Sequence, residues 1–274
     1  MMLALLSPVI LNKGVPPETT SGESIDIALT LSMADLKARF IDPPKGVVQY
    51  HAIRNSEEFQ TYKDLTKKLQ SFDLQSLKDR KQRLAFWINI YNAAVIHGII
   101  ELGLKKSVKE VPLFFDRMIY GMGGYRFSLN DMEHGILRGN RRPPYRLWKP
   151  FGKNDPRLAF AILPMDPRVH FTLVCGARSC PPIGFYEADQ IDFQLQLAAE
   201  SFVNSSQVRI SPEKNSVLIS TIFKWYKTDF GGSDLNLIDT LLNYLDEGEN
   251  KTYLKVNRKQ TQIQYQSYDW SLNH

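Results

Sequence analysis

The stretch from Leu84 to Leu104 constrains the fold more than any other part of this 274-residue chain. It is apolar over nearly the length that a membrane-spanning helix requires. It also carries Asn89, Asn92, His97 and Glu101, and polar side chains of this kind are costly to bury in lipid. The stretch therefore predicts a long buried helix in the core of a soluble protein, and no transmembrane segment.

Helical spacing of apolar residues recurs on both sides of this stretch. Ser or Asn stands at the start of several of these stretches, and Gly103 stands at the end of the central helix. These residue types are typical helix caps. We expect helices over residues 25–40, 56–69, 80–103, 128–137, 187–204 and 235–245, and a short one that runs from 220 or 221 to 226.

Strands are fewer. Alternating β-branched and aromatic residues predict a strand over 169–175, and turn residues predict a hairpin of 208–210 with 217–219. A terminal hairpin is expected from 253–256 with 262–268. Because repeated strand–helix–strand units are absent from the sequence pattern, we predict an α+β fold: a helical core around the long central helix, a short sheet and β-hairpin additions.

The chain is expected to begin with a flexible lead-in over residues 1–24, where prolines, Gly, Thr and Ser cluster. One domain follows over 25–274, with a helical part up to 140 and a mixed part from 141. Glycines and a Pro-Pro pair punctuate residues 112–156, which predicts a long loop of functional importance around the helix at 128–137.

Composition excludes several classes of protein. The net charge of +5 comes from 34 basic residues scattered among 29 acidic ones, which makes nucleic acid an improbable partner. Two cysteines do not make the framework of a disulfide-stapled secreted protein. The opening apolar run is interrupted by Pro8 and has no basic leader, which is a poor signal peptide. We expect a cytoplasmic protein.

The reactive side chains gather between Asp166 and Pro182. His170, Cys175 and Cys180 lie there within eleven residues. A thiol attacks only as its thiolate, which a nearby imidazole favours. On a straight strand His170 and Cys175 face opposite sides, whereas the turn at Gly176 allows the chain to fold back and bring the sulfur of Cys180 to the imidazole. Cys180 is therefore the preferred nucleophile, and Cys175 the second choice.

Supporting groups come from two helices. An imidazole base needs a group that orients it; Glu133 is the first choice, and His134 and Asp166 are the other candidates. Asn89 and Asn92 lie three residues apart on one face of the central helix. Their amides are expected to hold backbone in place; the functional alternative is that Asn92 donates to a developing oxyanion.

Three other interpretations of the cysteines stay open. They are small buried residues beside a structural histidine, or they form a disulfide with each other, or they bind zinc together with His170 and His134. The spacing of five is wider than that of a zinc knuckle. We predict no metal and no cofactor.

Six short motifs in this order resemble the family catalogued as domain of unknown function 547, over roughly residues 50–273. They are Phe86–Ala93, Glu133–Arg138, Asp166–Pro182, Lys224–Tyr226, Asp229–Gly231 and Tyr268–Asn273. The resemblance implies a helical core with β-ribbon additions, similar to thiol hydrolase architectures. It also implies that Cys175, Cys180, His170 and Glu133 occupy the family's Cys, His and Glu positions.

Two functions follow as hypotheses. The first is a cysteine-dependent hydrolase or acyltransferase that uses a Cys-His-Glu constellation. The second is a non-catalytic binding or scaffold module in which the same residues serve as structural support. In either case the partner is a substrate or protein that the sequence does not identify.

Overall fold

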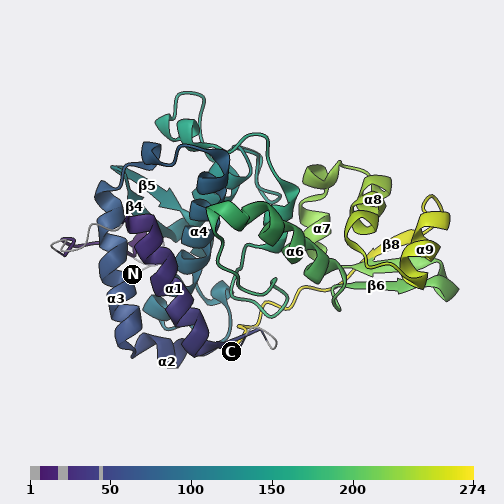
Figure 1. Ribbon diagram of the computed structural model, residues 1–274, viewed down its shortest axis with the longest axis horizontal. Helices are drawn as coiled ribbons and strands as arrows, with labels where there is room; N and C mark the ends of the chain where they lie inside the picture. Colours follow the sequence, from purple (N-terminus) through teal and green to yellow (C-terminus); the bar gives the residue numbers. More distant parts are fainter. Residues whose placement is uncertain (1–6, 18–23, 43–45) are drawn as a thin grey trace. The chain divides into compact units, whose positions relative to one another are not determined.

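The computed structural model describes residues 7–17, 24–42 and 46–274 (Figure 1). The chain forms two compact units. The first consists of the residues up to Asp166, of Leu173–Ile191 and of Trp270–His274, and the second of Pro167–Thr172 and Asp192–Asp269. Helices dominate and the sheets are small, so the α+β prediction is confirmed. The single domain over 25–274 stays a prediction.

Helix α4, Arg80–Leu102, is the buried centre of the first unit, as predicted. Asp79 and Gln82 form a capping box at its start, and Gly103 ends it in a left-handed conformation with φ 61°. Every residue from Leu84 to Ile100 is buried. Within the part of the chain that the structure describes, α4 alone is long and apolar enough to cross a membrane, and it lies inside the protein core.

Two further long helices belong to the first unit and agree with prediction. They are α1, Ile25–Phe40, and α3, Glu57–Lys68, which lie side by side (Figure 1). The side chain of Ser56 caps α3 by accepting a hydrogen bond from the amide of Phe59 at 3.1 Å. The short helices α2, Tyr50–Arg54, and α5, Phe114–Arg117, complete the set.

The first unit also contains strands that the sequence did not predict. In one sheet β1, Val9–Ile10, runs parallel to β4, Met118–Met122, which pairs with β5, Tyr125–Ser128, in a hairpin. Strands β2, Ile41–Asp42, and β3, Val47–Val48, form a second pair. The prediction of an irregular stretch over 112–156 is therefore wrong for its first part. The predicted lead-in contains β1, whereas its residues 1–6 and 18–23 lie outside the described residues.

The helix predicted over 128–137 exists in an unusual form. It winds as a π-helix over Asp131–Leu137. The side chain of Ser128 accepts from the amide of Asp131 at 3.1 Å, and the carboxylate of Asp131 accepts from the amide of Ser128 at 3.0 Å, so Ser128 caps its start. π-Turns inside helices are rare and often occur at functional sites.

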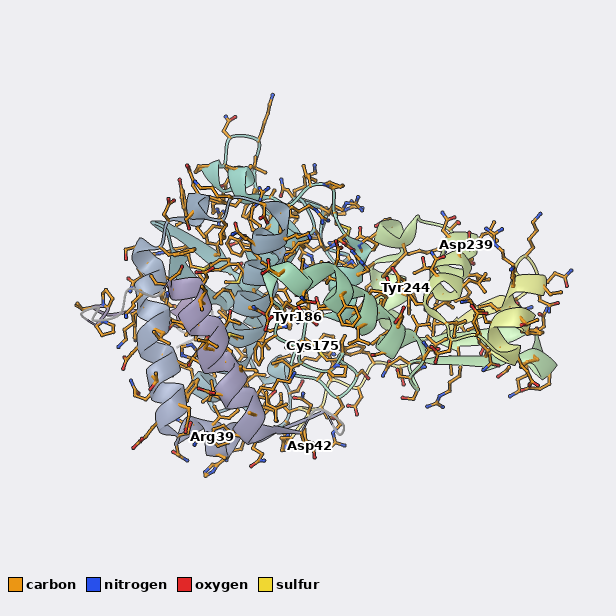
Figure 2. The ribbon with its side chains drawn as sticks, viewed as in Figure 1. Arg39, Asp42, Cys175, Tyr186, Asp239 and Tyr244 are labelled. Carbon is orange, nitrogen blue, oxygen red and sulfur yellow. A yellow bond between two sulfur atoms is a disulfide. The ribbon has the colours of Figure 1, made fainter. Side chains whose placement is uncertain are left out.

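The second unit packs helices on a small sheet. Its strands are β6, Val208–Ser211, β7, Ser216–Ile219, and β8, Gln262–Tyr265. Its helices are α6, Ile191–Val203, which starts at the end of the first unit, then α7, Thr221–Trp225, α8, Asp234–Tyr244, and α9, Glu249–Val256. The hairpin of β6 and β7 and the helices α6 to α8 are as predicted. The core holds Phe171, Phe202, Phe223 and Phe230, and Tyr244 of α8 packs edge-on against Phe171 (Figure 2).

The predicted terminal hairpin is wrong. Residues 253–256 belong to helix α9, and β8 pairs in parallel with β7 instead. The short apolar run around Leu254 fits one face of a helix as well as it fits a strand, and Leu254 is fully buried. Because β6 already occupies one edge of β7, β8 completes the sheet at the other.

The predicted strand over 169–175 is also wrong. The chain forms a 3-10 helix at Pro167–Phe171, and the amide of Thr172 donates to the carbonyl of Val169 at 3.0 Å. Val169, His170 and Phe171 are all buried. The alternating sequence pattern that predicted a strand therefore belongs to a segment that is buried on every side. His170 and Cys175 are therefore not separated by the opposite faces of a strand.

Candidate functional site

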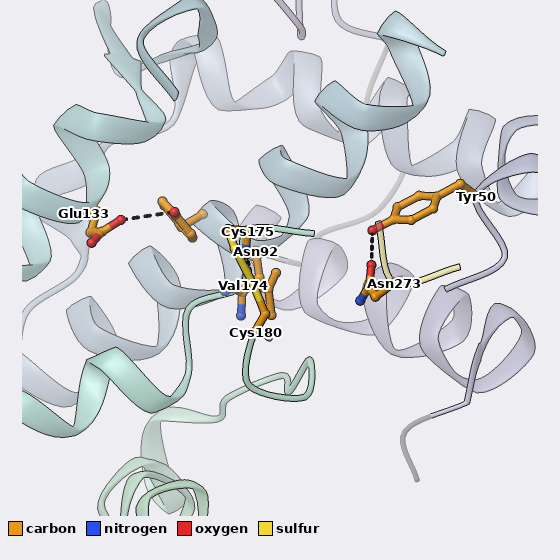
Figure 3. The surroundings of a disulfide bond; sticks show 8 residues. Tyr50, Asn92, Glu133, Val174, Cys175, Cys180 and Asn273 are labelled. Carbon is orange, nitrogen blue, oxygen red and sulfur yellow. Dashed lines mark hydrogen bonds between the residues drawn. A yellow bond between two sulfur atoms is a disulfide. The ribbon is translucent and has the colours of Figure 1, made fainter. Parts of the chain in front are cut away.

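Cys175 and Cys180 form a disulfide in the first unit (Figure 3). Their Cα atoms are 6.3 Å apart, and no cysteine is free. Of the interpretations left open by the sequence, the structure therefore contains the disulfide. Gly176 follows Cys175 with φ 75°, and a Cβ atom there would lie 2.4 Å from the Cδ1 of Ile99. Only glycine fits this turn.

The central helix holds the chain on both sides of the disulfide loop. The side-chain oxygen of Asn92 accepts from the amide of Val174 at 3.0 Å. Asn89 both donates to the carbonyl of Tyr186, at 2.8 Å, and accepts from its amide, at 2.9 Å. These bonds agree with the expectation that the two amides hold backbone in place. The role of Asn92 toward an oxyanion stays a prediction.

Residues Trp270–His274, which belong to the first unit, hold the disulfide loop at further points. Ala177 forms an antiparallel bridge with Leu272, and the amide of Arg178 donates to the carbonyl of Ser271 at 2.9 Å. Tyr50 donates to the side chain of Asn273 at 2.7 Å (Figure 3). The loop is therefore anchored at several points although it has no regular secondary structure.

A cavity of about 380 Å³ opens beside the disulfide. Its lining includes Cys180 but not Cys175, and both cysteines are half-buried. It is lined by Gly46, Val47, Ala177, Arg178, Cys180, Pro181, Pro182, Asn273 and His274. Of the two cysteines, Cys180 is thus the one that borders this space.

Glu133 lies in a buried polar cluster on the π-helix. Tyr91 of α4 donates to its Oε2 at 3.1 Å (Figure 3), and the Nδ1 of His134 lies 3.6 Å from its Oε1. Arg138, which is 2% exposed, places its Nη1 3.0 Å from the same Nδ1. Because a guanidinium only donates, this Nδ1 accepts and the imidazole of His134 is neutral.

Tyr145 belongs to the same surroundings. Burial raises the pKa of its phenol well above the usual range, and the negative charges of Glu133 and Asp116 raise this pKa further. Its hydroxyl donates to the side-chain oxygen of Asn130 at 2.6 Å. The cluster therefore keeps its tyrosine protonated at all physiological pH values.

His170 is in the second unit, and its imidazole has a carboxylate partner. Its Nε2 lies 2.9 Å from the Oδ2 of Asp229, and both side chains are at most 1% exposed. The ring stacks on Tyr226 at a centroid distance of 3.8 Å. Asp229 was not among the residues predicted from the sequence to orient the imidazole. Its only signal was that Asp229 begins one of the motifs shared with the family.

A zinc site finds no support in the described residues. They contain no group of three or more His, Cys, Asp or Glu side chains that could hold a metal ion. The two sulfur atoms, which would have been thiolate ligands, are bonded to each other. Among the described residues, the candidate site therefore consists of a disulfide and the cavity that Cys180 lines.

Comparison with known proteins gives one match. Residues 74–203 match the family described as "Protein of unknown function, DUF547". The matched region contains Asn92, Glu133, His170 and both cysteines, and it ends before Asp229. No curated protein and no solved structure matches the chain. Residues 74–203 are thus similar to the DUF547 family, as the motifs had indicated.

Proposed function

We propose that this protein is a cysteine-dependent hydrolase or acyltransferase, that Cys180 is its nucleophile, and that the enzyme works once the disulfide with Cys175 is reduced. The observation that carries the proposal is the place of Cys180, which lines the cavity beside the disulfide and is half-buried. A nucleophile must be reachable by substrate, and the place of Cys180 in the cavity lining supports this requirement.

The first step is activation by a small thiol. Its thiolate attacks one sulfur of the disulfide, forms a mixed disulfide and releases the other sulfur as a thiolate. A second thiol resolves the mixed disulfide and leaves as the oxidised small-molecule disulfide. Two protein thiols result, and two small thiols have been oxidised.

Acyl transfer follows. The thiolate of Cys180 attacks a substrate carbonyl, a carbon–sulfur bond forms, and the leaving group departs with the electron pair and takes a proton from the base. Water or an acceptor then attacks the thioester and regenerates the thiol. The oxyanion is stabilised by Asn92, as predicted from the sequence, or by the backbone amide of Gly176.

Two histidines are candidates for the base. His170 was predicted from the sequence, and its contact with Asp229 supplies the orienting carboxylate that such a base needs. In this scheme Glu133, the predicted orienting group, keeps that role as the alternative to Asp229. His274 lines the same cavity as Cys180 and is the second candidate for the base, which was not predicted from the sequence.

Alkylation of the reduced protein tests the proposal. We expect iodoacetamide at neutral pH to label Cys180 faster than it labels N-acetylcysteine, because a base lowers the pKa of the thiol. Acyl electrophiles should label wild type and Cys175→Ala but not Cys180→Ala, as read by mass spectrometry. If neither cysteine reacts faster than N-acetylcysteine, there is no activated nucleophile and the proposal is wrong.

The same assay identifies the base. His170→Ala should shift the pH profile of Cys180 alkylation upward if His170 is the base, and His274→Ala should do so if His274 is. His51→Ala, an exposed histidine on α2, serves as the control that leaves the profile unchanged. An unchanged profile in both test variants removes histidine from the mechanism.

A second candidate function is a binding or scaffold module without turnover. It is favoured by the bonds from Asn89 and Asn92, which give these polar residues a role in holding loops. In that case Cys180→Ala lowers stability or the affinity for a partner, and acyl probes give no turnover with the reduced wild-type protein.

A further inference from the structure

Unlike most arginines among the described residues, Arg178 makes no hydrogen bond or ion pair with its side chain. Its backbone amide is bonded to Ser271, but within the part of the chain that the structure describes its guanidinium makes no hydrogen bond and no ion pair. The side chain is exposed. By contrast, Arg146, Arg157 and Arg168 each contact a carboxylate.

None of the described residues that line this cavity together with Arg178 has an acidic side chain. Arg178 and Cys180 are two residues apart on one anchored loop and line the same space. A positive charge at the cavity that Cys180 lines attracts anions and repels cations. A guanidinium also binds carboxylate and phosphate groups with two parallel hydrogen bonds, which a point charge does not achieve.

The size of the cavity suits small molecules. Pockets for small ligands hold about 300 to 1,000 Å³, and this cavity holds about 380 Å³. Its lining by Pro181, Pro182 and Val47 supplies apolar walls around the charged group. A compact molecule with one anionic group and a short chain to its reacting atom fits this combination.

We infer that Arg178 is a specificity-determining residue, and that the sulfur of Cys180 reacts preferentially with small molecules that carry a carboxylate or phosphate group. For acyl substrates this inference rests on the proposed function, because it states which class of substrate the proposed enzyme prefers. Thiol exchange at the disulfide tests the charge preference even if the protein has no acyl transfer activity.

The experiment measures how fast small thiols open the disulfide of the intact, oxidised protein. Three thiols of similar size differ in charge: 3-mercaptopropionate is negative, 2-mercaptoethanol neutral and cysteamine positive. The thiolate of each attacks the disulfide as described above, and trapping with iodoacetamide followed by mass spectrometry gives the rate. Each rate in a variant is divided by the wild-type rate for the same thiol, so differences in intrinsic reactivity cancel.

For Arg178→Ala we expect the rate with 3-mercaptopropionate to fall about fivefold and the rate with cysteamine to rise by a similar factor, as one nearby charge in water predicts. The rate with 2-mercaptoethanol should stay within about twofold, since no Coulomb term acts on it. Arg178→Lys keeps the charge and should keep most of the preference. High salt should weaken the preference in wild type.

Controls separate this effect from others. Arg126→Ala removes the same charge from an exposed position on β5 that does not line the cavity, and it should leave all three rates unchanged. Equal slowing of all three thiols by Arg178→Ala would mean that Arg178 only stabilises the leaving thiolate, which overturns the inference. Three unchanged rates overturn it as well.

A second pair of thiols identifies the anion. Pantetheine is neutral, and its 4′-phosphate ester carries a phosphate group on the same skeleton. If Arg178 prefers phosphate, the ester opens the disulfide faster than pantetheine in wild type and loses this advantage in Arg178→Ala. If only 3-mercaptopropionate shows the preference, the selected group is a carboxylate.

Discussion

At the scale of single residues, buried amides on α4 connect the core to the loop that carries the disulfide. Asn89 satisfies both backbone groups of Tyr186, and both residues are buried (Figure 2 labels Tyr186). Buried backbone groups almost always have partners, because an unpaired one has lost its hydrogen bonds to water. A side-chain amide supplies a donor and an acceptor on two separate atoms, and Asn89 uses them for the carbonyl and the amide of Tyr186.

Asn89→Ala should therefore be strongly destabilising. It leaves the amide and the carbonyl of Tyr186 without partners, and we expect a loss of about 2 to 5 kcal/mol in the free energy of unfolding. Urea denaturation of the oxidised protein measures this loss. Asn55→Ala, at an exposed amide after α2, is the matched control and should cost less than about 1 kcal/mol. Equal losses in the two variants would contradict the role given to Asn89.

At the scale of elements, a hydrogen-bonded chain joins two helices to a strand. The Nδ1 of His97 on α4 lies 2.9 Å from the hydroxyl of Tyr120 on β4, which is 2.7 Å from the hydroxyl of Tyr62 on α3. All three side chains are buried. Burial lowers the pKa of His97 to about 3, and the charge of Lys63 lowers it further in the same direction.

This shift makes stability depend on pH. The unfolded chain binds a proton at His97 below pH 6.5, whereas the folded protein does so only near the lowered pKa of about 3. Stability is therefore present above pH 6.5 and falls as the pH is lowered. Between pH 7 and pH 5 the loss from this group is about 2 kcal/mol.

Urea denaturation of wild type and His97→Gln at both pH values measures the contribution of His97. The glutamine can still bond to Tyr120 but does not titrate, so the variant should lose about 2 kcal/mol less than wild type over this range. Other titrating groups affect both proteins alike. Identical losses would show that His97 is not held neutral by the fold.

The elements that the sequence predicted well are those with a repeated pattern. Helices α4 and α8 begin at side-chain caps, and the predicted bounds of α1, α4 and α8 agree to within about two residues. The mistaken predictions concern short segments, in which a few residues do not distinguish one structure from another. The run at 169–175 alternates because it is buried on all sides, and β1 is too short to show any pattern.

The residues of the candidate site could be predicted from the sequence, but the contacts between them could not. The cysteines and His170 stood out because reactive side chains cluster there, and a spacing of five is compatible with a disulfide as well as with free thiols. The contact of His170 with Asp229 joins residues 59 apart. Tertiary packing of the second unit creates that contact, and no local pattern encodes it.

At the scale of the whole molecule, the chain passes several times between the two units. Pro167–Thr172 is a short insertion into the second unit, and α6 begins in the first unit and continues in the second. Phe171 is the largest apolar side chain of the insertion and packs within the second unit against Phe202, Phe223 and Phe230. The core of the second unit therefore depends on a segment that precedes it by some twenty residues.

Phe171→Ala tests whether the units fold independently. Removing a buried phenylalanine costs about 3 to 5 kcal/mol, and hydrogen exchange with mass spectrometry locates the loss. If the units are separate, amides of β7 and α8 exchange faster in proportion while those of α4 keep their protection. We expect this result, because the ring contacts of Phe171 lie within the second unit. The outcome that contradicts it is an equal loss of protection in α4, and that outcome would support the single domain predicted over 25–274.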